Sequence, residues 1–405
     1  MKERPSEQAP PVALALSSSR GGPSRLHSLD ALRGIAALAV VFWHWQHFWP
    51  EGGLVAEDQP FYDVFRIFYN HGLKAVDLFF CLSGFIFFWL YSGKIERGAV
   101  STWRFFWLRV SRLYPLHLLT LLVVAIGQIV FTSVRGEPFV YSWNDARHFV
   151  LNLSMLQGLG LEQGYSFNNP SWSISVEAML YAVFFAACRL RMTRWFHLLS
   201  ISVAGLALIH LGSSNFGRGL ASFFLGGIAF SLYRWILGRP SARRELYTAV
   251  TAASTAIAWA LLAYALQYDL AVAEIPIVGW LAPIWRASHM PTLLPTMMFP
   301  SMILSLALIE ARGLRVPGWL TWLGDVSYSS YLWHFPLQLA FALAVPLAST
   351  PAAFRSPAML IGFYAALIPL SLASDRFFER PAQRALRDAL KPWEKVGGLS
   401  ESVRA

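Results

Sequence analysis

The first residues that could do chemistry are an arginine and a histidine inside an apolar run. The stretch LRGIAALAVVFWHW, residues 32–45, places Arg33 and His44 eleven residues apart. On a helix this spacing is about three turns, or roughly 16 Å of rise, so both side chains lie on one face. Ionisable groups in such a run usually face the interior of a helix bundle, where a histidine suits general base catalysis. The simpler interpretation is that Arg33 reaches the headgroups and His44 hydrogen-bonds within the bundle.

The second set of candidates is the carboxylates and hydroxyls of two other apolar runs. VDLFFCLSGF carries Asp77 and Ser83, and NNPSWSISVEAMLY carries Trp172, Ser173 and Glu177. We expect Glu177 to reach the depth of the histidine, and Glu177 or Asp77 to orient its imidazole as a carboxylate does in a catalytic triad. Donors to a developing oxyanion are expected among Ser83, Trp172 and Ser173. The structural alternatives are that Asp77 starts a helix near water and that Ser-Gly is a close-packing device.

The third set is basic and lies at the opposite end of the apolar runs. WRFFWLRVSRLYPLH carries Arg104, Arg109 and Arg112, and the three-residue spacing of the last two puts them on one helical face. Guanidinium groups bind phosphates bidentately, so this set is either an anion clamp or a topology anchor. Pro115 permits a helix break directly after it. His334, in SYSSYLWHFPL, is expected about 12 Å inside the bundle from the same side.

These residues must be positioned by a membrane protein. The 405 residues are 56% hydrophobic and 14% charged, whereas a soluble domain carries about 25% charged residues. We therefore predict an all-α polytopic bundle of about ten transmembrane helices. The expected segments are 29–49, 73–92, 113–133, 170–188, 195–212, 217–237, 245–266, 290–310, 326–348 and 356–374. The apolar stretches 148–160 and 275–285 are too short to span and are expected to be interfacial or re-entrant.

The distribution of basic residues predicts the orientation. With the N-terminus in the cytoplasm, 26 of the 33 Lys and Arg residues fall on the cytoplasmic side and 7 on the other. The positive-inside rule then places both termini in the cytoplasm. Because the basic residues cluster at the ends of apolar segments, the net charge of +10 is a topology signal, and no nucleic-acid partner is expected.

Three regions are predicted along the chain. Residues 1–25 form a disordered cytoplasmic tail, residues 26–380 the membrane domain, and residues 381–405 a basic cytoplasmic tail. Cys81 and Cys188 lie in apolar runs and are expected to be buried small hydrophobes, so neither a disulfide nor a metal site is predicted. The sequence predicts no particular oligomeric state.

Six ordered motifs resemble the membrane-bound acyltransferase-3 family. They are SLDALRGIAALAVVFWHW, VDLFFCLSGFIF, RFFWLRVSRLYPLH, NNPSWSISVEAMLY, SYSSYLWHFPL and FFERP, and together they cover roughly residues 29–381. The resemblance implies ten membrane helices and transfer of an acyl group, often acetyl, from coenzyme A to carbohydrate hydroxyls or to antibiotics. Some relatives carry an additional SGNH-hydrolase-like domain, which is not expected here.

The resemblance also implies roles for individual residues. The Arg-X10-His signature falls on Arg33 and His44, with His44 as the catalytic histidine. The Arg-X-X-Arg signature falls on Arg109 and Arg112, which would hold the phosphates of the donor, with Arg104 as a further candidate. The Trp-Ser-X-Ser-X-Glu block ends at Glu177, but this chain has Ala178 where the family often has a second glutamate, which argues against a pair of carboxylates.

The resulting expectation is an O-acyltransferase of the bacterial inner membrane. It would use acetyl-CoA or another acyl-CoA as donor, with no metal, and a lipopolysaccharide O-antigen or exopolysaccharide as acceptor. The acceptor, the acyl chain length and the choice between direct transfer and an acyl-enzyme stay open. The alternatives are a multi-pass transporter of acyl groups or polar solutes, an acyltransferase for a small molecule such as a macrolide, and a non-catalytic membrane partner.

Overall fold

The described part of the chain is entirely helical. The computed structural model describes residues 25–49, 53–212, 214–268, 290–314, 316–346 and 350–389, and within these ranges there is no strand. Almost all of the predicted N-terminal tail and the predicted short segment 275–285 lie outside the described residues. The all-α prediction is confirmed.

Ten helices correspond to the ten predicted segments. They are α1 (His27–His44), α3 (Lys74–Phe87), α5 (Thr102–Arg135), α7 (Trp172–Arg189), α8 (Trp195–His210), α9 (Ser214–Leu237), α10 (Ser241–Gln267), α12 (Met290–Ala311), α14 (Ser327–Ala344) and α16 (Pro357–Ser374). Six helical stretches in the described residues are long and apolar enough to cross a membrane, and two shorter apolar helices accompany them. The chain is therefore a multi-pass membrane bundle, while the count of ten spans stays a prediction.

Short elements connect these helices. They are α2 (Tyr62–His71), α4 (Gly93–Glu96), α6 (Ala146–Leu153), α13 (Gly318–Asp325), α15 (Thr350–Phe354) and α17 (Arg380–Asp388), with 3₁₀ turns at Trp45–Phe48, Ala56–Asp58 and Asn169–Ser171 and π-helical turns at Phe88–Ser92 and Asp375–Glu379. The first residues of the predicted C-terminal tail thus form a helix. Trp107 on α5 donates from its indole to the carbonyl of Leu386 at 2.7 Å and fastens α17 to the bundle.

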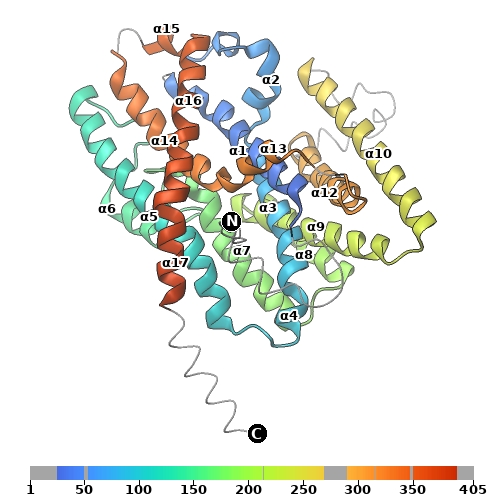
Figure 1. Ribbon diagram of the computed structural model, residues 1–405. Helices are drawn as coiled ribbons and strands as arrows, with labels where there is room; N and C mark the ends of the chain where they lie inside the picture. The colour runs from blue at the N-terminus through green and yellow to red at the C-terminus, as the bar shows by residue number, and fades with distance from the viewer. Residues whose placement is uncertain are drawn as a thin grey trace, which may run out of the picture.

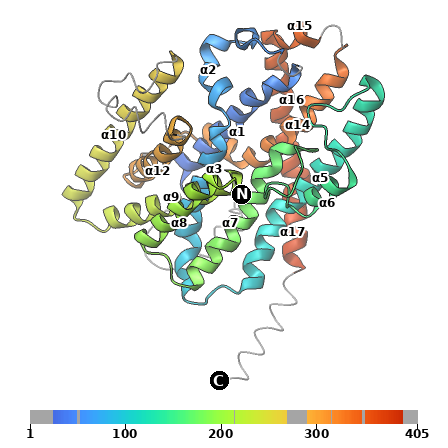
Figure 2. The ribbon, with the colours of Figure 1, turned by 180° about the vertical axis from the view of Figure 1, so that it is seen from behind.

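The helices form two groups with α1, α3 and α7 between them. Figures 1 and 2 show α5, α6, α14 and α16 on one side and α8, α9, α10 and α12 on the other. The short helices α2 and α15 lie at the top of Figure 1, and α4 and α17 lie at the bottom. Segments that the charge pattern assigns to the cytoplasm, α4 and α17, therefore lie at the end opposite to those assigned to the outside.

The helix break that Pro115 would permit does not occur. α5 runs for 34 residues straight through Pro115, and it begins eleven residues earlier than predicted. A proline removes one helical hydrogen bond and usually kinks a helix, but a buried neighbouring element can compensate for that cost. The consequence is that Arg104, Arg109 and Arg112 lie on the first turns of α5 itself and not on a loop before it.

Glycines allow α3 and α9 to touch backbone to backbone. A Cβ on Gly84 would lie 1.8 Å from the carbonyl oxygen of Phe223, and one on Gly226 would lie 2.0 Å from that of Cys81. Close approach through small residues is the usual way in which membrane helices associate. The prediction of a close-packing device at Ser-Gly is confirmed, and the predicted burial of both free cysteines is confirmed too.

The beginning of α1 is fixed by α12 and α13. The carboxylate of Glu310 accepts hydrogen bonds from the backbone N–H groups of His27 and Ser28 at 2.7 and 2.8 Å, which satisfies donors that a helix start leaves free. Gly34 packs against Leu323 so closely that a Cβ would lie 2.4 Å from that side chain. α1 is therefore held rigidly where the site residues begin.

Candidate functional site

The predicted catalytic histidine lies at the end of α1 beside a second histidine. His44 is 8% exposed, and the chain tightens into a 3₁₀ turn directly after it. This turn brings the ring of His47 to His44, with 3.2 Å between Nδ1 of His44 and Nε2 of His47. The hydroxyl of Tyr141, from the connection between α5 and α6, also lies 3.2 Å from Nε2 of His47.

Helix α14 supplies two further groups one turn apart. The side chain of Gln338 donates to the backbone carbonyl of His44 at 2.8 Å, and its Oε1 lies 3.0 Å from Nδ1 of His47. The His334 ring centre is 5.0 Å from that of His44. Nδ1 of His334 is bonded to the carbonyl of Tyr331, and its buried Nε2 has no partner among the described residues. His334 therefore offers a free acceptor next to His44.

Arg33 and His44 lie on the same face of α1, as predicted, and this face contacts α14. Its guanidinium donates to the hydroxyl of Ser327 at 3.1 Å, to the carbonyl of Gly324 at 3.1 Å and to Asp30 at 2.9 Å. Ser327 opens α14, and Gln338 lies eleven residues further along it, which matches the spacing of Arg33 and His44 on α1. Helices α1 and α14 therefore run parallel, with matching positions along their lengths in contact. Arg33 joins helices inside the bundle, so the interpretation that it reaches the lipid headgroups does not describe it.

Asp77 is completely buried in an ion pair and has no hydrogen bond to His44. The guanidinium of Arg218 on α9 donates two hydrogen bonds to the Asp77 carboxylate, both at 3.1 Å, and the hydroxyl of Thr296 donates a third at 3.1 Å. The same guanidinium lies over the ring of Trp172, with 5.6 Å to the centroid. The structure therefore brings Asp77 and Trp172 together around Arg218, away from the imidazole that Asp77 was predicted to orient.

Glu177 is also engaged elsewhere. It accepts hydrogen bonds from the hydroxyls of Ser83 at 2.9 Å and Tyr181 at 2.5 Å, and no described contact joins it to His44. Instead, Ser173, one turn earlier on α7, shares a 2.7 Å hydrogen bond with Tyr331. Tyr331 also accepts from His334 through its backbone carbonyl, so Ser173 and not Glu177 contacts a residue that is itself bonded to one of the histidines.

A polar stripe therefore runs along one face of α7. Ser173, Glu177 and Tyr181 follow one another at four-residue spacing, so they lie on one face over a rise of about 12 Å. At its far end Tyr181 lies 5.9 Å from the guanidinium of Arg109, measured to the ring centroid. The stripe connects the histidine cluster, defined here as His44, His47 and His334, with the arginines of α5.

Four arginines gather at that far end. Arg109 donates to the hydroxyl of Tyr91 at 3.1 Å, and its guanidinium lies against four aromatic rings. Arg112 is exposed and makes no hydrogen bond within the described residues, yet it repels Arg33 electrostatically. Arg387 on α17 repels both Arg109 and Arg112. We call Arg33, Arg109, Arg112 and Arg387 the arginine cluster; Arg104 is exposed at the start of α5 and belongs to its edge.

The connection between α5 and α7 folds back along α5. The carbonyl of Asn152 accepts from His117 at 2.8 Å and that of Leu153 from Tyr114 at 3.1 Å, which is near the middle of α5. Asp145 caps α6 through the backbone N–H of His148 at 2.9 Å, and this hydrogen bond is the main reason why the pKa of Asp145 lies below its ordinary value. Residues 148–160 hold only the end of the eight-residue helix α6, which is too short to span, as predicted.

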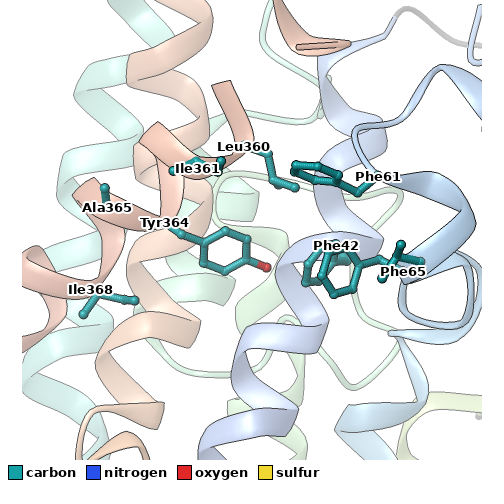
Figure 3. Close-up of a pocket in the computed structure, with 9 residues that line it drawn as sticks. Phe42, Phe61, Phe65, Leu360, Ile361, Tyr364, Ala365 and Ile368 are labelled. Carbon is teal, nitrogen blue, oxygen red and sulfur yellow. The ribbon is translucent and has the colours of Figure 1, made fainter. Parts of the chain in front are cut away.

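A cavity of about 660 Å³ opens on the other face of α1. Figure 3 shows Phe42, Phe61 and Phe65 facing Leu360, Ile361 and Tyr364 across it. The Tyr364 hydroxyl is already bonded to the carbonyl of Leu38 at 2.9 Å. The cavity therefore presents no reactive group, and it lies apart from the histidine cluster.

Three residues of the site were not predicted from the sequence. His47 follows His44 in HWQH at helical i,i+3 spacing, and that pattern was a readable signal. Gln338 follows His334 by four residues, but an isolated glutamine in an apolar helix carries no such signal. Arg387 belongs to the basic tail, where charge alone does not reveal a contact with α5. Within the described residues, no group of three or more His, Cys, Asp or Glu is placed to hold a metal ion.

The fold and the site define a multi-pass membrane enzyme with a buried histidine cluster linked to a cationic cluster. Residues 26–374 match the family described as an acyltransferase domain, and the chain belongs to that family. It is a membrane acyltransferase.

Curated relatives support the same assignment. The chain is 34% identical to the acyltransferase MdmB of Streptomyces mycarofaciens over 40% of this chain and 38% of that protein. It is 28% identical to the putative membrane-bound transacylase BcsY of Komagataeibacter xylinus, over 77% and 73% of the two chains. It is 24% identical to the peptidoglycan O-acetyltransferase OatA of Listeria monocytogenes, over 88% of this chain and 56% of that one. The chain thus spans only part of these relatives. No solved structure matches it significantly.

Proposed function

We propose that this protein transfers an acyl group, expected to be acetyl, from cytoplasmic acyl-CoA to a hydroxyl of an exported or cell-surface glycan at the bacterial inner membrane. The observation that carries the proposal is the α7 stripe, which connects the histidine cluster with the arginine cluster, where Arg112 repels Arg33 and Arg387 repels both Arg109 and Arg112. Mutually repelling cations are held together at a cost that a polyanionic ligand relieves. The phosphates of coenzyme A supply such a ligand.

The donor is expected to bind with its phosphates at the arginine cluster. Arg112 is exposed and has no hydrogen bond within the described residues, so its guanidinium can receive a phosphate without breaking an internal contact. Arg109 is fixed by its aromatic neighbours and supplies a positioned charge. The acyl-pantetheine arm would then lie along Tyr181, Glu177 and Ser173 towards the histidines.

The acceptor hydroxyl is expected to meet the thioester at the histidine cluster. His44 takes the hydroxyl proton while the oxygen attacks the thioester carbonyl. The C–S bond then breaks, and the proton on the imidazole passes to the departing thiolate of coenzyme A. A positioned base contributes about 10²–10⁴-fold. Nε2 of His334 can accept a hydrogen bond from a substrate donor, while Ser83 and Ser173 have hydroxyls near the path.

The glycan acceptor rests on the relatives and on topology. OatA of Listeria monocytogenes is a peptidoglycan O-acetyltransferase, and this chain is similar to it. A lipopolysaccharide O-antigen or an exopolysaccharide is the acceptor that we propose here.

Reconstitution tests the proposal. Purified protein in liposomes is given radiolabelled acetyl-CoA outside and glycan acceptor inside, and label on glycan is measured. His44→Ala should abolish transfer. His117→Ala should retain it, because His117 is buried and, among the described residues, hydrogen-bonds only to a backbone carbonyl. Label that enters unattached would indicate a transporter, and label on a macrolide but not on glycan would indicate the small-molecule alternative. Undiminished transfer by His44→Ala would overturn the assigned base.

The donor site is tested separately. A charge-assisted hydrogen bond is worth about 1.5–3 kcal/mol, so Arg112→Gln or Arg387→Gln should each raise the KM for acetyl-CoA by roughly 10- to 100-fold with kcat little changed. Arg239→Gln is the matched control, because Arg239 stacks on Trp235 and lies outside the arginine cluster. An unchanged KM in both variants would show that these arginines only anchor the topology.

A further inference from the structure

The histidine cluster contains a chain of hydrogen bonds whose direction can be worked out atom by atom. We propose that Gln338 and His47 are positioning residues that hold His44 in the tautomer with a proton on Nδ1 and a free lone pair on Nε2. The proposal rests on the proposed role of His44 as general base, and it names what replaces the carboxylate that the sequence predicted for this purpose.

The chain of hydrogen bonds starts at the backbone carbonyl of His44, which can only be an acceptor. A backbone carbonyl only accepts hydrogen bonds, so the atom of Gln338 that faces the carbonyl of His44 at 2.8 Å must be the amide nitrogen. The other end of the same amide, Oε1, is then an acceptor. The orientation of Gln338 is thus set by its partner and not by an arbitrary choice between oxygen and nitrogen.

The second step fixes His47. Because Oε1 of Gln338 accepts, Nδ1 of His47 at 3.0 Å must carry the proton. A neutral imidazole has one donor nitrogen and one acceptor nitrogen, so Nε2 of His47 is an acceptor. Two groups face it, each at 3.2 Å: Nδ1 of His44 and the hydroxyl of Tyr141. Both must donate.

The third step fixes His44. Its Nδ1 donates to His47, which leaves Nε2 as the nitrogen with the lone pair. The neighbouring His334 does not compete for that lone pair, because its own Nδ1 proton goes to the carbonyl of Tyr331 and its Nε2 is therefore an acceptor as well. No described residue donates to Nε2 of His44, so the base is free to take the proton of an acceptor hydroxyl.

This arrangement differs from a carboxylate-oriented triad in its charge. In the triad a buried aspartate stabilises the imidazolium that forms. Here Asp77 is occupied by Arg218 and Glu177 by Ser83 and Tyr181, and His44 is oriented by a neutral ring and a neutral amide. The proton that His44 receives stays on Nε2 until the coenzyme A thiolate removes it, and Nδ1 keeps its own proton throughout.

The test compares two variants with a matched control. His47→Phe keeps an aromatic ring against Phe335 and Tyr141 but removes both nitrogens, and Gln338→Met removes the amide. The control is Gln128→Met, because Gln128 is equally buried and also bridges two groups, both belonging to the backbone of Phe139. Each variant is reconstituted, and its kcat, KM and melting temperature are measured.

We expect kcat to fall about 10- to 100-fold in the first two variants, which is less than the roughly 10²–10⁴-fold that the base itself contributes, with the KM for acetyl-CoA unchanged. Gln128→Met should lose a similar amount of thermal stability and keep its kcat. An unchanged kcat in both His47→Phe and Gln338→Met, in protein as stable as the control, would overturn the proposal.

A spectroscopic measurement separates this inference from the proposed function. Protein labelled with ¹⁵N in histidine, studied by magic-angle-spinning NMR in liposomes without substrate, reports which nitrogen of His44 is protonated, with His44→Asn used to assign its signals. The expected spectrum has Nδ1 of His44 protonated, and Gln338→Met should shift His44 towards the other tautomer. Protonation at Nε2 in the unaltered protein would overturn the inference. If the tautomer is as expected but no donor or glycan supports transfer, the proposed function fails while the orientation of His44 stands.

Discussion

The ion pair of Asp77 and Arg218 allows a decisive test of whether Asp77 belongs to the chemistry. Asp77 is fully buried, and the side chain of Arg218 is 14% exposed. Lys74 is a weaker third member, with its ammonium 3.9 Å from the carboxylate. Removing one partner of a buried pair costs about 3–5 kcal/mol, because the other charge is left uncompensated.

The structure predicts that the two single substitutions are unequal. Asp77→Asn leaves both Arg218 and Lys74 without their counter-charge, so it should cost about 3–5 kcal/mol. Arg218→Met keeps the apolar stem and leaves Asp77 with Lys74, so its cost should fall at or below the lower end of that range. The double variant removes both charges, and it should be less destabilised than the sum of the singles by about 0.5–3 kcal/mol.

The assay is thermal unfolding in detergent, followed by tryptophan fluorescence, with transferase activity expressed per folded molecule. We expect Asp77→Asn to lower the melting temperature by several degrees and the double variant to recover part of that loss. Activity per folded molecule should stay close to that of the unaltered protein. The reasoning is refuted if Asp77→Asn melts normally but loses turnover, and if the second substitution does not restore it.

Two further predictions concern packing and pH. Gly84→Ala should abolish accumulation of folded protein, because its Cβ would collide with the carbonyl of Phe223, while Gly362→Ala, which meets nothing within 4 Å, should be neutral or slightly stabilising in a melting experiment. Asp145 stabilises the cap of α6 above its ordinary pKa, and this contribution is lost as the pH falls through its lowered pKa. Asp145→Asn keeps a capping side chain without titrating, so its melting temperature should depend less on acid pH; an identical acid profile would contradict the cap.

The helices were predictable because bilayer thickness and the backbone's need for internal hydrogen bonds fix them locally. The shared face of Arg33 and His44 followed from the helical repeat alone. The predicted start of a helix at residue 113 was wrong, because a proline's local cost says nothing of the neighbouring elements that offset it. In the structure α5 begins at Thr102, eleven residues before the predicted start.

The partners of the site residues could not be predicted because they depend on how helices distant in sequence are placed along each other. Glu177 meets Ser83 across 94 residues, and Gln338 meets His44 across 294 residues. A shift of α3 against α7 by one turn, about 5.4 Å, would have paired Glu177 differently with no change in either sequence pattern. Local patterns can identify which residues are polar and on which face, but not which of them meet.

The proline of α14 explains how the outer connection is tied to the histidine cluster. Pro336 has no N–H, so the carbonyl of Leu332, four residues earlier, lacks its helical donor. The side chain of Asn168 donates to that carbonyl at 3.2 Å. A buried carbonyl left unpaired costs about 1–3 kcal/mol, so this bond holds the start of α7 against the turn of α14 that carries His334. The motifs NNPSW and LWHFP are thus two halves of one contact, in which the backbone defect of the second is filled by the first asparagine of the first. The stripe on α7 and the histidines on α1 and α14 consequently share one fixed frame.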